Sequence, residues 1–331
     1  MARRVGIVVI GRNEGERLRA CLASLPSPYR DVVYVDSGST DGSLELASGF
    51  GAHGVALDMS IPFTAGRARN EGFRTLLAMA PDIEFVQFLD GDSTLLPDWL
   101  DAACDAMSAD PRRAVVAGQI IERRPDASVY NRLFALEWAS PPGDMRDYGP
   151  LAGTLFARAS AFSAVGGFNP QVIAGEDSEF GVRCALAGYV VTKLGQTMAV
   201  HDADMHSFAQ WWKRAVRSGH AIGQRARLHG EGPLHDCRRE LRSALAWGLA
   251  LPGTALALAP LSGGASLLVA AGGFALLAAR IYLHRRRRGD SARHSWLYAR
   301  YLVLTKFAQV IGLLRYQLNA LRGQFRIIEY K

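Results

Sequence analysis

Two aspartates one residue apart, Asp90 and Asp92, end an apolar run that begins at Phe85. The run predicts a buried strand, and open α/β sheets bind their ligands at the carboxyl edge of such strands. Paired carboxylates separated by a glycine can hold a hard divalent cation such as Mg²⁺ or Mn²⁺, which prefers oxygen ligands and bridges to phosphate oxygens. A solvated acidic turn has the same local sequence, so the interpretation depends on the elements around it.

Apolar strands alternate with amphipathic helices up to about residue 118, which predicts an α/β layer fold with a mostly parallel central sheet. The polar, aromatic stretch 125–150 is suited to a loop that covers a substrate. The predicted strands cover residues 5–10, 31–35, 85–89, 115–121 and 190–194.

A polar loop that contains two glycines, residues 36–43, follows the second predicted strand and opens a helix. This is the usual place for a nucleotide in α/β folds, because the amino terminus of the helix favours phosphate. The loop matches neither the Gly-x-Gly-x-x-Gly dinucleotide fingerprint nor a Walker loop. A dehydrogenase or kinase interpretation therefore lacks its main support.

Three further positions have side chains suited to the same chemistry. The helix that starts at Thr64 carries Arg67 and Arg69 in its first turns, where guanidinium groups can neutralise a diphosphate, although arginines are also common on helix surfaces. Carboxylates crowd the helix start at 176–179, where the macrodipole favours them, so plain capping is the alternative. His201 follows a late strand and is either a third metal ligand or a structural hydrogen-bonding residue.

The carboxyl-terminal third has a membrane-like composition. No charged residue occurs from Ser243 to Ala279, and an arginine cluster follows at Arg285–Arg288. The net charge of +7 therefore favours an anionic lipid surface over nucleic acid as the partner. The four cysteines have no paired or metal-ligand spacing, which is typical of a reducing compartment, and the six-residue run Val5–Ile10 is too short for a signal peptide.

Two segments, 243–261 and 263–283, are long enough to cross the hydrocarbon core as helices at about 1.5 Å per residue. Arginines flank the pair on both sides, so the positive-inside rule predicts that both ends are cytoplasmic. A single tilted span or a buried alanine-rich hairpin is the alternative. The amphipathic segment at about 296–322 predicts an interfacial helix or a helix packed on the rest of the protein.

Five stretches, taken in order, resemble the motifs of the family 2 nucleotide-sugar glycosyltransferases, which are inverting enzymes of the GT-A fold. The resemblance covers roughly residues 4–220 and implies a Rossmann-like GT-A catalytic domain over residues 1–235. A helical membrane region over 236–331 would follow it. The stretches are Val8–Glu14, Val35–Ser43, Gly66–Gly72, Asp90–Asp92 and Gly175–Asp177.

The resemblance also implies roles for individual residues in donor binding. Arg69 resembles the position near the diphosphate, and Arg67 is its weaker neighbour. Asp90 resembles the residue that contacts ribose or metal, and Asp92 resembles the principal metal ligand. His201, a candidate by its place after a strand, is expected to join them as a further ligand. The positions that resemble nucleoside-contacting carboxylates are Glu14, Asp36 and Asp41.

Asp177 resembles the catalytic base, with Glu176 beside it as the less favoured substitute. Processive members of the family carry Gln-x-x-Arg-Trp after the base, whereas this chain has Gln-Trp-Trp-Lys-Arg at 210–214. Arg214 or Arg217 can still reach a diphosphate from this segment. The altered spacing favours transfer of a single sugar over synthesis of a long polymer.

The sequence as a whole predicts a membrane-anchored, metal-dependent inverting hexosyltransferase at the cytoplasmic face of a bacterial-type inner membrane. The expected donor is a nucleotide-diphosphate sugar, with a UDP-sugar favoured. The expected acceptor is lipid-linked, such as a polyprenyl phosphate, in envelope polysaccharide, exopolysaccharide or glycolipid synthesis. The alternatives are a processive polysaccharide synthase and a non-catalytic scaffold that binds sugar nucleotides.

Overall fold

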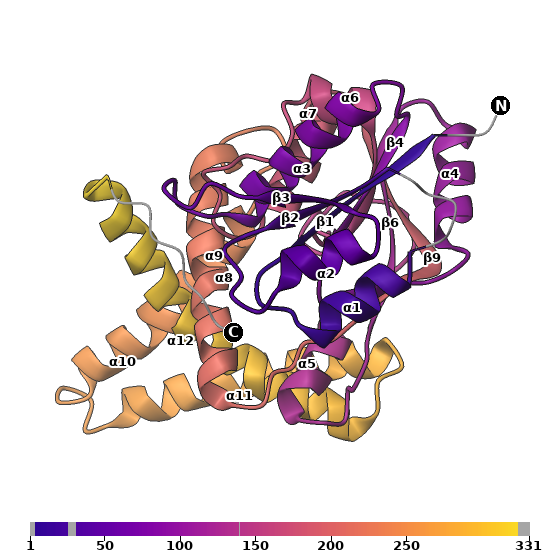
Figure 1. Cartoon of the computed structure of the whole chain (residues 1–331). Helices are drawn as coiled ribbons and strands as arrows, with labels where there is room; N and C mark the ends of the chain where they lie inside the picture. The colour runs from indigo at the N-terminus through magenta and orange to yellow at the C-terminus, as the bar shows by residue number, and fades with distance from the viewer. Residues whose placement is uncertain (1–3, 26–30, 139, 324–331) are drawn as a thin grey trace. The chain divides into compact units, whose positions relative to one another are not determined.

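A computed structural model describes residues 4–25, 31–138 and 140–323. The chain forms two compact units (Figure 1). The sheet unit comprises residues 1–127 and 137–204, and the helical unit comprises residues 128–136 and 205–331. The domain boundary predicted at residue 235 falls inside the helical unit and stays a prediction.

The sheet unit is built on nine strands in the order β3-β2-β1-β4-β8-β6-β9-β5, with β7 paired to β9. Pairing is parallel across β3-β2-β1-β4 and between β6 and β9, and it is antiparallel at β8, β5 and β7. The α/β prediction is confirmed, but the sheet is mixed. The strands are β1 Val5–Gly11, β2 Val32–Asp36, β3 His53–Ala56, β4 Phe85–Asp90, β5 Ser93–Leu95, β6 Arg113–Glu122, β7 Gly143–Asp144, β8 Leu155–Arg158 and β9 Val190–His201.

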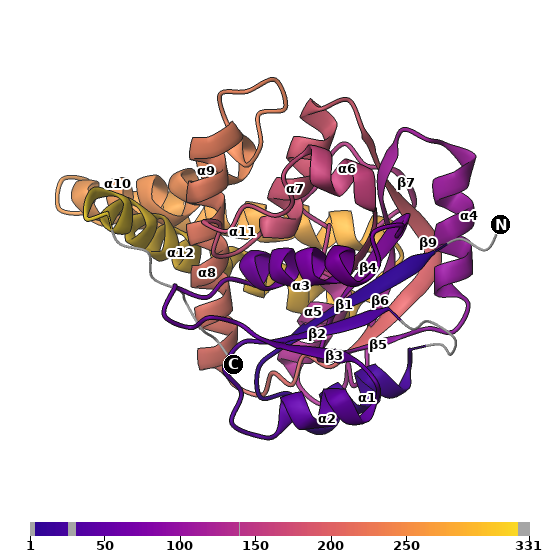
Figure 2. The same ribbon diagram turned by 45° about the horizontal axis from the view of Figure 1, so that its top comes forward.

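Helices cover both faces of this sheet, because successive side chains of a buried strand point to opposite faces. Val8 and Ile10 of β1 belong to the apolar core shared with α3, α6 and α7, whereas Ile7 and Val9 belong to the core shared with α1, α2 and α4. Figure 2 shows α3 on one side of the strands and α1 and α2 on the other. The helices are α1 Glu16–Ala23, α2 Ser43–Gly49, α3 Ala65–Met79, α4 Trp99–Ala109, α6 Ala159–Ala164 and α7 Glu176–Leu186.

Two local predictions were wrong, and some short strands were not predicted. Residues 125–150 contain a helix, α5 Val129–Trp138, and the short strand β7 instead of a continuous loop. Strand β9 runs unbroken over twelve residues, because irregular pairing with β6 between Ala117 and Ile120 lets the ladder pass the polar segment after Leu194. The short strands β3, β5 and β8 were also not predicted, since none of them carries a long apolar run.

The helical unit contains most of α5 and the whole carboxyl-terminal region. Three of its helical segments, Arg238–Leu258, Ala265–Arg287 and Ala292–Leu321, are long and apolar enough to cross a membrane. Two of them correspond to the predicted spans, and the third is the segment predicted to be interfacial. The elements are α8 Phe208–His229, α9 Arg238–Leu245, the π-helical turn η1 Ala246–Ala250, α10 Leu251–Leu258, α11 Ala265–Arg287 and α12 Ala292–Leu321.

Candidate active site

The loops after β1 and β2 are joined to each other by hydrogen bonds at the carboxyl edge of the sheet. Asn13 adopts a left-handed conformation (φ 54°), its amide oxygen accepts the Thr40 N–H at 2.8 Å, and its own N–H donates to the Ser39 hydroxyl at 2.9 Å. The Gly15 N–H donates to the Asp41 carboxylate at 3.0 Å. The two loops predicted to bind a nucleotide therefore form one preorganised edge.

Asp36 and Asp41, predicted to contact the nucleoside, bind their own loops. Asp36 is buried and accepts the Tyr34 hydroxyl at 3.1 Å and the N–H groups of Gly38 and Ser39 at 3.0 and 2.8 Å. The Ser43 hydroxyl donates to Asp41 at 2.5 Å and is the main cause of a lowered Asp41 pKa. Both carboxylates therefore hold the loop shape, and their contact with a nucleoside stays a prediction.

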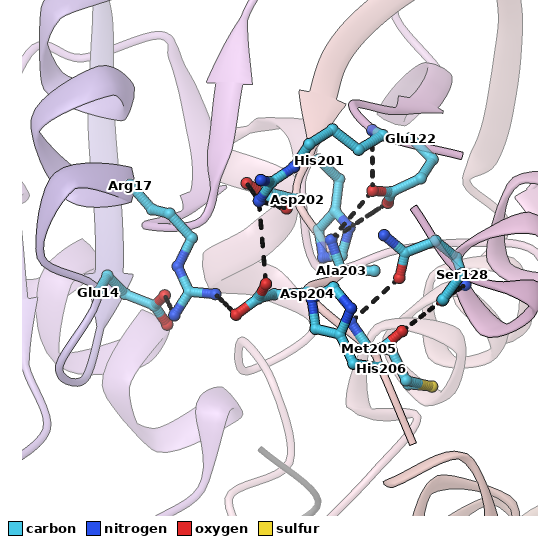
Figure 3. A network of polar contacts seen from close by, with 12 residues as sticks. Glu14, Arg17, Glu122, Ser128, His201, Asp202, Ala203, Asp204, Met205 and His206 are labelled. Atoms are coloured by element: carbon cyan, nitrogen blue, oxygen red, sulfur yellow. Dashed lines mark hydrogen bonds and ion pairs between the residues drawn. The ribbon is translucent and has the colours of Figure 1, made fainter. Parts of the chain in front are cut away.

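Glu14, the third carboxylate predicted to contact the nucleoside, is one end of a chain of charges. Arg17 pairs with Glu14 at 3.0 Å and with Asp204 at 3.6 Å, and Figure 3 shows it between the two. Arg124 in turn pairs with Asp202 at 3.1 Å and with Asp204 at 3.8 Å. This chain links the loop after β1 to the segment that follows β9.

Arg69 is the buried centre of the site. It is 3% exposed, and its guanidinium donates to Asp90 at 2.5 Å and to Glu176 at 2.7 Å. Burial lowers its pKa, but Asp90, Glu176 and Asp177 outweigh that effect and raise the pKa above its usual value. A Cβ on Gly153 would lie 1.9 Å from the nearer guanidinium nitrogen, so only glycine leaves room for it.

This arrangement ties the end of β4 to the start of α7 through Arg69, which lies 107 residues before Glu176 in the sequence. The predicted contact of Arg69 with a diphosphate is not tested by these ion pairs and stays a prediction. Arg67 lies on the surface, where its guanidinium donates to the backbone carbonyls of Asp58, Ile61 and Pro62 and so braces the loop before α3.

The two adjacent carboxylates at the start of α7 differ in their surroundings. Glu176 is buried against Arg69, whereas Asp177 is partly exposed and accepts the Ser178 N–H at 2.6 Å. A base must reach an acceptor hydroxyl, so the exposed Asp177 suits the predicted catalytic role better than the enclosed Glu176. Gly175 in the left-handed region (φ 71°) precedes the pair and turns the chain into the helix.

Asp92 and His201 are brought together by backbone pairing. Ser93 of β5 is the register partner of His201 in β9, and the Asp202 N–H donates to the Asp92 carbonyl at 3.1 Å. The His201 Nε2 then lies 3.5 Å from an Asp92 carboxylate oxygen. The same two groups belonged to the metal ligands predicted from the sequence.

This pair fits a divalent cation. Two ligands 3.5 Å apart can share an ion at roughly 2.1–2.2 Å from each, which is the distance for nitrogen and oxygen ligands of such ions. Among the described residues there is no group of three histidine, cysteine or acidic side chains that could hold a metal. Mg²⁺ in particular is usually held by one or two carboxylates with substrate phosphates and water. Asp90 is paired with Arg69, so its predicted part as a ligand stays a prediction.

Sequence patterns did not reveal one residue of this region, Glu122. Its carboxylate is enclosed at the end of β6, with one oxygen 3.3 Å from the His201 Nδ1. The edge of the Trp138 ring system meets the same histidine at a centroid distance of 4.5 Å. The only available signal was that Glu122 directly follows the apolar strand run that ends at Ile121.

Arg214, predicted to reach the diphosphate, belongs to the helical unit. Its guanidinium lies over the Phe134 ring at 3.9 Å. The glutamine of the altered motif, Gln210, forms a capping box with Ser207 and so starts α8. Neither contact tests the predicted role of Arg214, which stays a prediction.

A mixed α/β sheet with an Asp-x-Asp at the end of β4 and a carboxylate-rich helix start at α7 defines the GT-A class of transferases. Comparison with known families agrees with this class. The family Glycosyl transferase family 2 matches residues 6–163, and Glycosyl transferase family group 2 matches residues 85–304. The chain belongs to the family 2 glycosyltransferases, and it is therefore a transferase enzyme.

Proteins similar to this chain include a glycosyltransferase and two solved structures of the same fold. Glycosyltransferase AglE of Haloferax volcanii is 25% identical over 225 residues, which is 65% of this chain and 71% of AglE. One solved structure is the mannosyltransferase PcManGT from Pyrobaculum calidifontis in complex with GDP-Man and Mn²⁺. It superposes with a TM-score of 0.64 at 22% identity, and the match covers 96% of this chain and 88% of PcManGT. S. aureus TarS 1-349, solved in complex with UDP-GlcNAc, gives a TM-score of 0.51 at 16% identity over 97% and 92%. Both likenesses establish the GT-A fold.

Proposed function

We propose that this protein moves one sugar from a nucleotide-diphosphate sugar to a hydroxyl or phosphate of a lipid-linked acceptor, with inversion at the anomeric carbon. The observation that carries the proposal is the bridge from Asp90 through Arg69 to Glu176. It joins the strand end expected to bind the donor to the helix that presents Asp177. Donor site and base then belong to one rigid network.

The donor and the metal are part of the same proposal. PcManGT binds GDP-Man with Mn²⁺ and TarS binds UDP-GlcNAc, so this fold accommodates different nucleotide-diphosphate sugars. We propose a UDP-sugar as the first donor to test. A divalent cation held by Asp92 and His201 would supply positive charge to offset the negative charge that develops on the diphosphate.

Asp177 is proposed to take the proton of the acceptor hydroxyl as the oxygen attacks the anomeric carbon. Attack from the face opposite the departing diphosphate inverts the configuration, and help from a general base is typically worth about 10²–10⁴-fold in rate. Arg69 holds Glu176 at 2.7 Å and keeps that neighbouring carboxylate out of the reaction. The acceptor proton therefore goes to the carboxylate that is open to solvent.

A panel of UDP-, GDP- and dTDP-sugars tests this proposal with the full chain in detergent and Mn²⁺ or Mg²⁺. Released nucleotide diphosphate is measured for wild type, Asp92→Asn and Asp177→Asn, with the exposed Asp101→Asn as the matched control. We expect one donor to be hydrolysed by wild type and Asp101→Asn and by neither site variant. Nucleotide binding without turnover, even when polyprenyl phosphate is added, would favour the scaffold alternative.

The number of sugars transferred separates the two enzymatic alternatives. With a lipid acceptor and an excess of donor, mass spectrometry of the product should show the addition of one sugar residue. A ladder of longer products would instead establish a processive polysaccharide synthase.

Membrane attachment is proposed to use two spans and one surface helix. In the most apolar 18-residue stretch of each helix, 33% is buried inside the protein for α12, against 11% for Arg238–Leu258 and 6% for α11. Helix α12 packs closely along α8, since a Cβ on Gly312 would lie 2.0 Å from the Val216 carbonyl oxygen. Helix α8 carries basic side chains over much of its length, including the exposed Lys213, and cannot lie in hydrocarbon without a large cost.

Helix α12 is therefore proposed to lie with α8 at the membrane surface, on the side where the arginine-flanked ends of the two spans lie. The arginines that flank the two spans, from Arg238 and from Arg285 onward, support a cytoplasmic location for that side of an inner membrane. Cysteine labelling with a membrane-impermeant maleimide tests the topology, because the four native cysteines are buried. Ser262→Cys should be labelled from the outer side, and Arg288→Cys and Leu321→Cys from the inner side. Labelling of Leu321→Cys from the outer side would establish three spans.

A further inference from the structure

Glu122 is a fully enclosed carboxylate that the proposed reaction does not use. Its side chain is 0% exposed, and it ends β6 at the register position of His201 in β9. Enclosing an ionisable group costs free energy unless it has partners, so its surroundings indicate what it does. All of its recorded polar contacts lie within the sheet unit.

The contacts of Glu122 converge on the segment that carries His201. The carboxylate accepts the Ala203 N–H at 3.2 and 3.3 Å and the Arg124 N–H at 3.4 Å, and one oxygen lies 3.3 Å from the His201 Nδ1 (Figure 3). The two backbone donors hold the carboxylate in place beside the histidine ring.

Carboxylates face both nitrogens of the histidine ring, since Glu122 lies 3.3 Å from the Nδ1 and Asp92 lies 3.5 Å from the Nε2. A neutral imidazole carries one N–H and one lone pair, so a cation bound at the Nε2 requires the proton on the Nδ1. The Glu122 carboxylate is placed to accept that N–H. Backbone pairing between β5 and β9 brings His201 and Asp92 together but does not fix the rotation of the ring.

We propose that Glu122 is a positioning residue that orients His201 so that its Nε2 and Asp92 form a preorganised ligand pair for the divalent cation. The inference rests on the proposed function, because it assumes that this pair holds a metal. Ligating histidines generally donate their second N–H to a carboxylate or carbonyl, and removal of such a partner typically weakens metal affinity by about 10–100-fold. Trp138 also packs against the ring, with the ring centroids 4.5 Å apart.

The test is a thermodynamic cycle of Mn²⁺ binding to the full chain in detergent with saturating UDP or GDP, measured by calorimetry and by electron paramagnetic resonance. The variants are Glu122→Gln, Glu122→Ala, His201→Ala and the double variant Glu122→Gln/His201→Ala. Glu84→Gln, an exposed glutamate before β4, is the matched control. Nucleotide affinity in EDTA and the melting temperature report whether each variant is folded.

We expect Mn²⁺ affinity to fall by about 10–100-fold in Glu122→Ala, less in Glu122→Gln, and not at all in Glu84→Gln. In the His201→Ala background, Glu122→Gln should add less than about a twofold change, because its effect acts through the ring. An equal loss with and without His201, or unchanged affinity in folded Glu122 variants, would overturn the positioning role and leave the proposed function intact. Failure of wild type to bind Mn²⁺ with any nucleotide would overturn both.

Discussion

The Arg69 guanidinium leaves no room for a Cβ at Gly153, so Gly153→Ala tests the ion pairs of Arg69 directly. A Cβ at this position would lie 1.9 Å from the Nη2 and 2.4 Å from the Cζ of Arg69. The guanidinium would have to move by roughly 1.5 Å to reach ordinary contact at about 3.4–4.0 Å. Both of its ion pairs, to Asp90 and to Glu176, would then be stretched well beyond hydrogen-bond length.

The size of the effect follows from those two contacts. Hydrogen bonds to charged groups contribute about 1.5–3 kcal/mol each, and the Asp90 carboxylate is partly open to water, so its share is discounted. We expect Gly153→Ala to lower the free energy of unfolding by about 2–4 kcal/mol, which corresponds to a fall in melting temperature of about 4–16 °C for a unit of this size. Transferase activity should fall by at least about 100-fold, because donor site and base lose their common anchor.

Thermal melts followed by circular dichroism, together with donor hydrolysis, measure these effects. Gly49→Ala is the matched control, since a Cβ there meets no atom within 4 Å. In an Arg69→Ala background the clash disappears, so Gly153→Ala should add less than about 0.5 kcal/mol. A Gly153→Ala variant with wild-type melting temperature and activity would refute the reasoning.

Three further predictions concern other parts of the chain. Burial lowers the pKa of His220 to about 4, below the unfolded value of about 6.5. The contribution of neutral His220 to the free energy of unfolding should therefore be complete above pH 6.5 and fall by up to about 3 kcal/mol as the pH drops toward 4. Thermal melts of wild type and His220→Phe between pH 4.5 and 7.5 should diverge, and parallel curves would exclude His220 as the source of the pH dependence. Gly312→Leu should separate α12 from α8 and expose it to limited proteolysis, whereas Gly272→Ala, which meets no atom within 4 Å, should not. Asp41→Ala should weaken nucleotide binding by about tenfold or more in calorimetry, because the loops after β1 and β2 lose their link through Gly15; unchanged affinity would show that the link is dispensable.

The sequence predicted the parts of the site that depend on local order. Short, mostly apolar runs mark β1, β2 and β4, and the polar residues that follow each run lie at one edge because neighbouring strands in that part of the sheet are parallel. The exposed position of Asp177 and the buried one of Glu176 could not be predicted in this way. Both residues begin the same helix, and only packing against Arg69 distinguishes them.

Predictions failed where local pattern and tertiary context disagree. The stretch 125–150 lacks a long apolar face, yet α5 forms within it because Leu133, Phe134 and Leu136 are buried by neighbouring elements. The segment at about 296–322, predicted to be interfacial or packed on the rest of the protein, forms α12, which packs against α8 at Gly312 and is also long and apolar enough for a span, so its place in the membrane stays a prediction. Local composition limits the structures that a segment can form, and packing against its neighbours selects one of them.

The sequence by itself determined that this is an α/β protein with acidic strand ends, a carboxylate-rich helix start and an apolar carboxyl-terminal region. These features follow from residue type and short-range periodicity, which set local structure directly. The tertiary structure alone decided that Arg69 joins Asp90 to Glu176 and that Glu122 contacts His201. The partners of the Arg69–Glu176 and Glu122–His201 contacts lie 107 and 79 residues apart. Contacts of such long range depend on strand order and register, which no local pattern encodes.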